Sequence, residues 1–516
     1  MNVKLSKFRA VLLLFTLFFT FAFCGAAFAE EYVEGEALVL LKYNGSGTSR
    51  LSGAGIAARG VVDIASVTVQ SHVQRVAAAS DATVFTTYNA LSAATGEIFA
   101  HFKSETETTE ELIKRLKEDP NVISASPNHI LRAFARPDDS YYNQLWGMEK
   151  INAPRAWDVT TGDSTVYVAV VDTGIWSAHE DLAANFDKSH STGFGKDGQT
   201  IQDYNDDVGH GTHVSGTIGA AGNNGKGVAG VNWNTKIIAV KVFYFDDDKK
   251  DYIASDASLL AGINYIKNLL DNNPSLRVTA INISLGGWSS GDPDSDDIKG
   301  SCLYKAFRAL SETNKTVIVV AAGNEGLEVG KPASQDFKFT DYTVSKDHYC
   351  YPASFRGIDN MIVVGATDSS DSAPSFTNWS KDYVDILAPG ENIISSTSGD
   401  NYAYGSGTSM AAPHVAGAVA LLASINKGWK APDLKRIILA TANNSVKPTT
   451  GSSVRQDGNP VSKNGLLDIG TAVQMAKSDA SGGGGGGGCD TGAGVFLALA
   501  LLVGFVAAMR KKRVNE

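Results

Sequence analysis

From about Asp138 to Ala476, apolar runs rich in Val and Ile alternate with stretches of helical spacing. Uninterrupted apolar runs are typical of strands buried on both faces, and helices between such strands favour parallel pairing. This part of the chain is therefore expected to form an α/β domain with a mostly parallel central sheet. The expected strands are 165–172, 236–243, 277–285, 315–323 and 361–367.

The preceding region, residues 30–136, has a different pattern and is expected to form a small α+β domain. Residues 36–43 predict a strand. Apolar residues at helical spacing over 112–116 predict a helix that Pro120 ends, and the alternation over 122–126 predicts another strand.

The N-terminus has the features of a secretory signal peptide over residues 1–29. Three basic residues precede an apolar run from Ala10 to about Phe23, and the Ala-Phe-Ala at 27–29 fits the small-x-small cleavage pattern. A permanent anchor helix is disfavoured by that cleavage pattern, and a lipoprotein signal at Cys24 is disfavoured by the bulky Phe23. The main domain is therefore expected to be exported.

The C-terminus combines a glycine-rich linker, 478–490, with an apolar tail, 491–516. Seven consecutive glycines predict a flexible tether. The apolar stretch 495–509 is at the short end for a membrane span, and the four basic residues after it are expected to stay cytoplasmic. This arrangement resembles bacterial sorting signals and implies a cell-surface anchor that is retained or processed. Cys489 is open to lipidation, to nearby cleavage or to neither.

The composition describes a globular protein, with 43% hydrophobic residues and a net charge of −10. The negative charge disfavours nucleic acid as a partner. Once the leader with Cys24 is removed, Cys302, Cys350 and Cys489 remain, which allows at most one internal disulfide.

Polar residues follow three of the expected strands, at Asp172, at Ser284-Leu285-Gly286 and at Asn324. Functional groups gather beyond the carboxyl ends of the strands in such sheets. Ser409 lies where a small-residue turn opens a helix, and unpaired N–H groups there can stabilise an oxyanion. A serine nucleophile needs a base and an orienting carboxylate, and His210 and Asp172 are available for these roles.

The segment DVGHGTHVSG holds two histidines, His210 and His213, and allows two interpretations. The pair could hold the metal of a metallohydrolase, although the chain has no HExxH motif. Alternatively, His210 is a catalytic base and His213 packs beside the site. The second is favoured, because the sequence offers a matching acid, nucleophile and oxyanion donor but no third metal ligand.

Five motifs in chain order, VAVVDTGI, HGTHVSGTI, NISLGG, AAGNEG and GTSMAAPHVAG, resemble the signatures of subtilisin-like serine proteases (subtilases). The resemblance spans essentially all of 138–476. It implies a subtilisin-like three-layer fold for residues 137–477 and serine endopeptidase activity. The implied roles are Asp172 as orienting acid, His210 as general base and acid, Ser409 as nucleophile and Asn324 as oxyanion donor.

The resemblance also implies a groove for extended peptide substrates. The segment Ser284-Leu285-Gly286 would pair with the substrate as an added strand. Ala322 and Gly323 would wall the specificity pocket, with Cys350 at its base where the family commonly has glycine. Cys302 and Cys350 lie on segments expected to be close, so a disulfide and two free thiols both stay open.

Further matches to the family imply a structural calcium ion, which hard oxygen ligands suit. A hydrogen-bonded loop without an ion is the alternative, and no catalytic metal is expected. The alternating acids at 292–296 lack the glycine and the final glutamate of a calcium loop and predict a solvated acidic loop. The matched calcium ligands are Asp139, Asp181, Asn224 and the carbonyls of Gly222, Lys226 and Val228.

Residues 30–136 end in DPNVISASPNHILRA and resemble subtilase propeptides. This implies a folding chaperone and inhibitor that autocatalytic cleavage near Phe134 to Asp138 removes. The expected partners are therefore the chain's own propeptide, protein or peptide substrates and, through the tail, a membrane.

The leading hypothesis is a secreted, cell-surface-anchored serine endopeptidase made as a zymogen. Broad degradation of extracellular protein and selective processing of surface proteins both stay open. An acidic pocket that prefers basic residues would indicate selective processing, but Glu325 at the pocket rim is the one residue that hints at such a preference. A catalytically dead binding protein is disfavoured by the full catalytic set.

Overall fold

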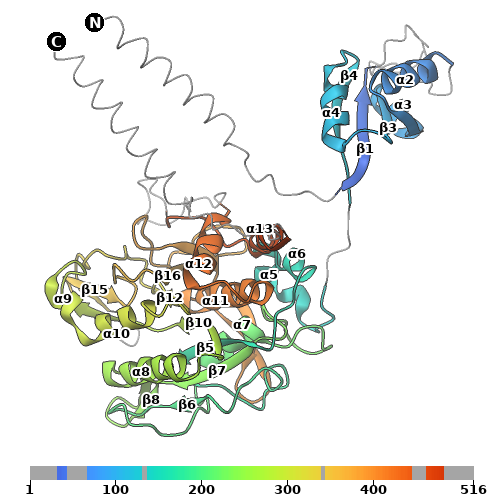
Figure 1. Ribbon diagram of the computed structural model, residues 1–516. Coiled ribbons are helices and arrows are strands. Elements are labelled where there is room, and N and C mark those ends of the chain that lie inside the picture. The colour runs from blue at the N-terminus through green and yellow to red at the C-terminus, as the bar shows by residue number, and fades with distance from the viewer. Residues whose placement is uncertain (1–31, 43–66, 131–135, 339–342, 444–460, 482–516) are drawn as a thin grey trace, which may run out of the picture. The chain divides into compact units, whose positions relative to one another are not determined.

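The computed structural model describes residues 32–42, 67–130, 136–338, 343–443 and 461–481 (Figure 1). The chain divides into two compact units, residues 1–133 and 134–516. The predicted signal peptide, the glycine run and the apolar tail lie outside the described residues.

The first unit is an antiparallel sheet, ordered β2-β3-β1-β4, that packs against helices. Alternate residues of β1, such as Val39 and Leu41, are buried with Leu112 and Leu116 of α4. A capping box begins α4, in which Thr108 Oγ1 accepts from the Glu111 amide. The predicted elements are confirmed as β1, α4 and β4. The unit comprises β1 Tyr32–Leu41, α2 Val67–Ala79, β2 Thr83–Thr87, α3 Asn89–Thr95, β3 Ile98–Lys103, α4 Thr109–Glu118 and β4 Val122–His129.

The second unit is built on a seven-stranded sheet of order β17-β16-β12-β10-β5-β7-β6. All the pairings in it are parallel, and the five predicted strands are confirmed as β5, β7, β10, β12 and β16. The strands of the sheet are β5 Val166–Asp172, β6 Thr192–Gly193, β7 Lys236–Lys241, β10 Arg277–Ile283, β12 Val317–Ala321, β16 Met361–Thr367 and β17 Ile386–Pro389.

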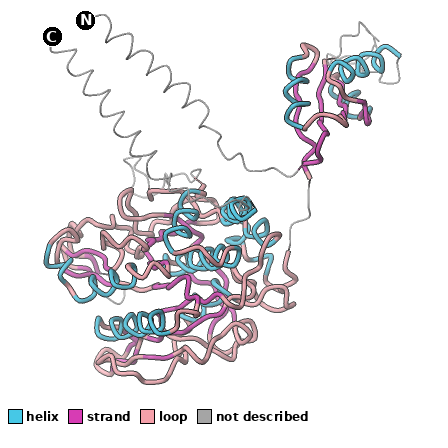
Figure 2. The backbone as a smooth tube through the Cα atoms, in the orientation of Figure 1, coloured by secondary structure: helices cyan, strands magenta, loops and turns pink. Residues whose placement is uncertain are grey.

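Helices cover both faces of this sheet (Figures 1 and 2). Along β5, Val168 and Val170 belong to a core shared with α7 and α11, whereas Ala169 and Val171 belong to a core shared with α8 and α10. The fold is therefore a three-layer α/β arrangement. The helices are η1 Tyr142–Gln144, α5 Trp146–Lys150, α6 Ala153–Trp157, α7 His210–Gly219, α8 Asp256–Asn272, α9 Asp296–Gly300, α10 Cys302–Ser311, α11 Thr408–Ile425, α12 Ala431–Ala440 and α13 Ile469–Ser481.

The second unit also contains short two-stranded antiparallel ribbons outside the central sheet. One of them joins β11 to β15 and holds Cys350 in a buried position, whereas Cys302 at the start of α10 is exposed. Both cysteines are free thiols, so the disulfide alternative is not formed. The ribbon strands are β8 Tyr244–Asp246, β9 Asp251–Ile253, β11 Gly287–Ser290, β13 Phe337–Lys338, β14 Thr343–Val344, β15 His348–Tyr351, β18 Ile393–Thr397 and β19 Asn401–Gly405.

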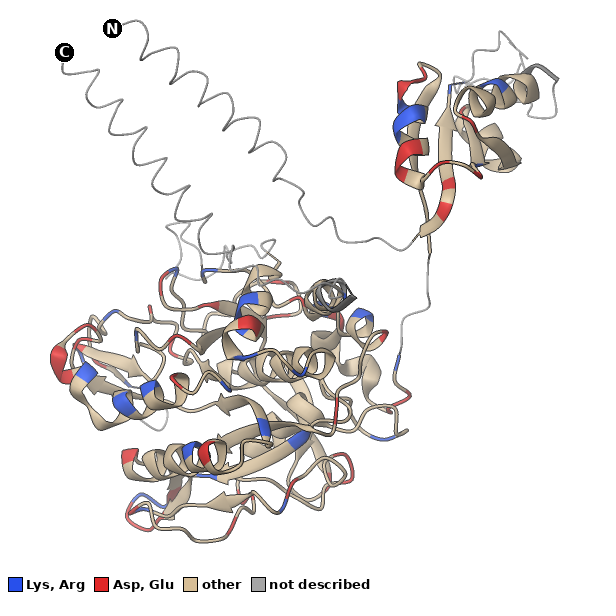
Figure 3. Ribbon diagram, viewed as in Figure 1, with Lys and Arg blue, Asp and Glu red and all other residues tan. Residues whose placement is uncertain are grey.

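The acidic segment 292–297 lies on the surface, where Ser295 caps the short helix α9 (Figure 3). Asp292 accepts from the Asp294 amide, and Asp294 pairs with Lys299. The segment is a solvated acidic loop, as predicted.

Helices α7 and α11 pack closely because small residues line their contact. A Cβ on Gly417 of α11 would lie 3.3 Å from Ile218 O of α7, and one on Gly216 of α7 would lie 2.4 Å from Ser395 Oγ of β18, so glycine lets α7 approach both neighbours. Among the described residues, α11 is also the one helix long and apolar enough to cross a membrane, but most of it is buried in the core of this unit.

Each of these two helices buries a histidine. Burial lowers the pKa of His213 and of His414 from 6.5 to about 4. Above pH 6.5 each of these histidines is neutral in both the folded and the unfolded state, so its burial carries no protonation cost. As the pH falls from 6.5 to about 4, only the unfolded state takes up the proton, and the fold loses stability.

We therefore predict that a Ser409→Ala protein, which lacks the predicted nucleophile, loses about 3 kcal/mol of unfolding free energy per buried histidine across this interval. Replacing His414 by Leu should remove about half of that histidine-linked loss in denaturant titrations at several pH values. Leu421→Ala, buried in the same helix, should lower stability equally at every pH. An unchanged pH slope in His414→Leu would contradict the assignment.

Candidate active site

Asp172 and His210 meet at the carboxyl end of the parallel sheet. Asp172 is the last residue of β5 and is fully buried, and His210 is the first residue of α7. His210 Nδ1 donates to Asp172 Oδ1 over 2.7 Å, and the Thr173 amide donates to the same oxygen. The carboxylate thereby holds the imidazole with Nε2 available as a base.

The glycines on either side of His210 allow this approach. Gly209 has φ of +95°, and a Cβ there would lie 2.5 Å from Thr397 Oγ1. A Cβ on Gly211 would lie 2.2 Å from Gly174 O. A larger residue at Gly211 would push α7 away from the end of β5, and one at Gly209 would push it away from the end of β18.

Two opposing effects set the pKa of His210. Burial lowers it, whereas the charge of Asp172, the hydrogen bond to it and the charge of Asp206 raise it, and the net pKa lies above 6.5. The site therefore stabilises the imidazolium form, which a base must adopt after accepting a proton.

Ser409 is the second residue of α11 and is partly exposed. Its Oγ donates to Ser284 O over 3.2 Å, and Ser284 Oγ donates back to Ser409 O over 3.1 Å. In this conformer the hydroxyl is bonded to the segment that follows β10, and it must rotate to engage His210. Catalytic hydrogen bonds of this type often form only with a substrate bound.

Asn324 is exposed just beyond β12, and its orientation is fixed by Thr408. The amide and the hydroxyl of Thr408 both donate to Asn324 Oδ1, over 2.7 and 3.0 Å. Thr408 Oγ1 in turn accepts from the Gly323 amide over 3.0 Å. Because Oδ1 is engaged twice, the Nδ2 group is left to donate to a developing oxyanion.

His213 lies one turn after His210 and is buried. Its Nε2 donates to Ile393 O and Ala403 O, which belong to β18 and β19. His213 therefore ties α7 to the β18–β19 hairpin and does not face the same site as His210.

The predicted specificity pocket residues come together around Cys350. Cys350 Sγ lies 3.7 Å from Ala322 O, and a Cβ on Gly323 would lie 3.1 Å from that sulfur. A Cβ on Gly286 would lie 2.8 Å from Tyr351 O, which brings the 284–286 segment to the same place. Burial raises the pKa of the Cys350 thiol well above its usual range, and Glu325 adds to this.

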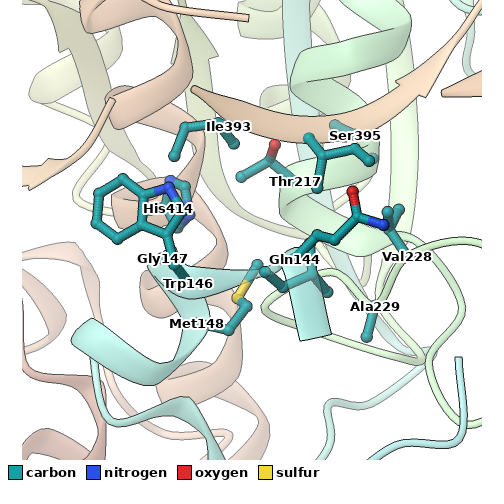
Figure 4. Close-up of a pocket in the computed structure, with 13 residues that line it drawn as sticks. Gln144, Trp146, Gly147, Met148, Thr217, Val228, Ala229, Ile393, Ser395 and His414 are labelled. Atoms are coloured by element: carbon teal, nitrogen blue, oxygen red, sulfur yellow. The ribbon is translucent and has the colours of Figure 1, made fainter. Parts of the chain in front are cut away.

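A separate pocket lies between the helices that carry His210 and Ser409 (Figure 4). Trp146, Met148 and His414 line it, together with Thr217 and Ser395. His414 Nδ1 donates to Met410 O within α11. None of the predicted catalytic residues lines this pocket, so it belongs to the packing behind the site.

The predicted calcium ligands are also brought together. Asn224 Nδ2 donates to Asp181 Oδ1 over 2.9 Å, and the Val228 amide donates to Asp181 Oδ2 over 2.9 Å. The Asn223 amide donates to Asp139 Oδ2 over 2.6 Å. Gly222 and Lys226 lie on the same loop. No group of three or more His, Cys, Asp or Glu suited to a metal occurs in the described part of the chain, so the two carboxylates would need amide and carbonyl oxygens to complete this site.

Two residues that the sequence analysis did not single out take part in the site. Asp206 is buried beside His210, and Thr408 directs Asn324. Thr408 lies within the motif GTSMAAPHVAG, one residue before Ser409, whereas Asp206 directly precedes the segment DVGHGTHVSG, four residues before His210. Their position close in sequence to a predicted catalytic residue was the one sequence signal that could have identified them.

Comparisons with known proteins agree with this geometry. The profile of the subtilase family matches residues 163–465. A thermophilic serine proteinase of Bacillus sp. (strain AK1) is 34% identical over 65% of this chain and 71% of its own length. An extracellular protease of Xanthomonas campestris pv. campestris is 34% identical over 61% of this chain and 54% of its own. A solved protease structure from Pseudoalteromonas arctica PAMC 21717 is 25% identical, with a TM-score of 0.51, and the match covers 66% of this chain and 100% of that one.

We predict that Thr408→Val lowers kcat about tenfold and leaves KM nearly unchanged. The variant keeps the backbone bond to Asn324 but loses the hydroxyl bond to it and the bond accepted from the Gly323 amide. Because the backbone bond still orients Asn324, the cost should be smaller than that of removing an oxyanion donor outright. Thr408→Ser, which keeps the hydroxyl, should retain most of the activity in steady-state peptide hydrolysis. Equal losses in both variants would show that packing, and not the hydroxyl, is responsible.

Proposed function

Since this chain belongs to the subtilase family and is a subtilisin-like serine endopeptidase, we propose that Asp172, His210 and Ser409 are its catalytic triad. The observation that carries the proposal is the 2.7 Å bond from His210 to a buried Asp172, at the sheet end where α11 presents Ser409. Asn324 is proposed as the side-chain donor of the oxyanion hole.

The proposed reaction begins when His210 Nε2 takes the proton of Ser409 Oγ and the oxygen attacks the scissile carbonyl carbon. The resulting oxyanion accepts hydrogen bonds from Asn324 Nδ2 and from the Ser409 amide in the first turn of α11. The protonated His210 then gives its proton to the leaving amine. A water molecule, activated by the same base, hydrolyses the acyl-enzyme and restores Ser409.

Substrate binding supplies a reason for the serine to rotate. An extended peptide that pairs with residues 284–286 would use the Ser284 carbonyl as an acceptor. That carbonyl is bonded to Ser409 Oγ in the present conformer. Competition by the substrate would release the hydroxyl toward His210, so that the nucleophile is activated when a peptide is in place.

Residues 30–136 are proposed to be an inhibitory propeptide and folding chaperone. The separate compact unit ending at 133 supports this, because the division falls beside the expected cleavage region. This unit also contributes six of the ten exposed large apolar residues that are described, which favours a protein partner for it. They are Val33, Phe85, Tyr88, Leu91, Ile123 and Ile130.

Export and surface anchoring are proposed from the sequence of the two ends. The Xanthomonas relative, named an extracellular protease, supports export of this chain. Anchoring by residues 491–516 rests on the apolar stretch and its basic end.

One experiment on the full-length chain tests both the proposed triad and the proposed removal of the propeptide. Wild-type protein should label with a fluorophosphonate probe and become cleaved between Phe134 and Asp138, whereas Ser409→Ala should do neither. Ser406→Ala, in the exposed turn before α11, is the matched control and should label normally. Labelling of Ser409→Ala at the wild-type level would refute the assignment of the nucleophile.

A structural calcium ion is proposed for the loop at 222–228. Asp139 and Asp181 are both buried, and Asp139 Oδ1 has no partner among the described residues. Burial raises the pKa of Asp139, its backbone hydrogen bonds lower it, and the like charge of Asp181 raises it further. A divalent cation would supply the missing partner and offset this repulsion. Asp139, Asp181, Asn224 and the loop carbonyls would hold the ion, which would brace the loop and play no part in the chemistry.

Calcium should raise the thermal midpoint of Ser409→Ala protein relative to a chelated sample. The gain is about 3 kcal/mol when free calcium exceeds its dissociation constant a hundredfold. Asp181→Asn should lose most of this gain, whereas Asp292→Asn in the acidic surface loop should keep it. The same calcium response in both variants, or none in the parent, would rule out this site.

A further inference from the structure

We propose that Asp206 is a positioning residue for the reaction, which ties the first turn of α7 to the end of β5 and places a second negative charge beside His210. The inference rests on the proposed role of His210 as the base. It assigns part of the base's orientation and charge to a residue outside the triad.

Asp206 is 1% exposed, and both of its carboxylate oxygens are engaged. Oδ1 accepts from the amides of Val208 and Gly209, over 3.0 and 2.8 Å. Oδ2 accepts from the amide and the hydroxyl of Thr212, over 2.9 and 2.6 Å. These donors flank His210 on both sides, so the carboxylate caps α7 where the base stands.

The same carboxylate reaches the strand that carries the orienting acid. Thr173 Oγ1 donates to Asp206 Oδ1 over 2.8 Å and accepts from the Gly211 amide over 2.8 Å. Thr173 directly follows Asp172, and its own amide donates to Asp172 Oδ1. Asp206 and Thr173 therefore connect the two sides of the Asp172–His210 bond through their own hydrogen bonds.

Asp206 remains ionised in this position. Burial alone would raise its pKa, but the hydrogen bonds from Thr212, Gly209 and Thr173 outweigh it and hold the pKa below the usual range. A buried negative charge near His210 favours the imidazolium that forms when the base accepts the serine proton.

The effect of Asp206 on the charge of His210 can be separated from the effects of the other charged groups nearby. Asp172 on β5 supplies the larger attraction, and His213 and His414, on α7 and α11, are neutral near pH 7. Lys241, at the end of β7, is bonded to Asp207 over 2.7 Å and to Asn205 O. Strand β18, which also packs on α7, carries no charged residue.

The test compares pH profiles of kcat/KM for Asp206→Asn, Thr212→Val and wild-type protein. Asparagine removes the charge, so His210 should lose its proton more readily and the acid limb should move about half a unit to one unit lower. Thr212→Val keeps the charge but removes the hydroxyl that donates to Asp206 Oδ2 and accepts from the Trp176 amide. It should lower kcat about tenfold without moving the limb, because the base is less well held.

Asp187→Asn is the matched control. Asp187 is bonded to His190, and its amide donates to Ile237 O near the opposite end of β7. The Asp187→Asn substitution should leave both kcat and the acid limb of the pH profile unchanged. Thermal unfolding and fluorophosphonate labelling of each variant establish that it is folded.

An acid limb in Asp206→Asn that stays at the wild-type position would overturn the electrostatic part of the proposal. Wild-type kcat in both Asp206→Asn and Thr212→Val would overturn the positioning part. Failure of the proposed function has a different signature, namely that His210→Ala retains activity and shows no change in its pH profile.

Discussion

The hydrogen bond between Asp172 and His210 is the interaction on which the account of this site depends. It requires that β5 end beside the first residue of α7, with no side chain between them. The parallel register of β5 with β7 and β10 sets the position of Asp172. Gly209 and Gly211 let the histidine approach, and the buried carboxylate of Asp206 fixes the turn that presents it.

Three histidines on α7 and α11 show how surroundings decide what one side chain does. His213 and His414 are buried among carbonyls and apolar groups, which leaves them neutral, and they serve the packing of the two helices. The side chain of His210 is 32% exposed, and two carboxylates near it favour its charged form. Charge near the ring and partial exposure together therefore separate the proposed base from its two buried neighbours.

Much of this arrangement follows from local sequence. The buried strands were predictable because continuous runs of Val and Ile rarely form anything other than buried strands. Asp172, Ser284 and Asn324 could then be predicted to lie near one another, because parallel strands bring their carboxyl ends to the same edge of the sheet. The motifs themselves pointed to His210 and Ser409. The roles of Asp206 and Thr408 could not be predicted, because their partners are backbone amides and side chains that only the tertiary fold brings near. Whether Cys302 and Cys350 form a disulfide or stay free likewise depends on the placement of α10 against the β11–β15 ribbon, which no local sequence pattern encodes.

The central claim is that a buried carboxylate orients His210 and favours its charged form. It is tested most directly by an NMR titration of the His210 ring in Ser409→Ala protein, with and without Asp172→Asn. We expect a His210 pKa above 6.5 in the parent and a clear fall when Asp172 is neutralised. A pKa at or below 6.5 that does not respond to Asp172→Asn would contradict it.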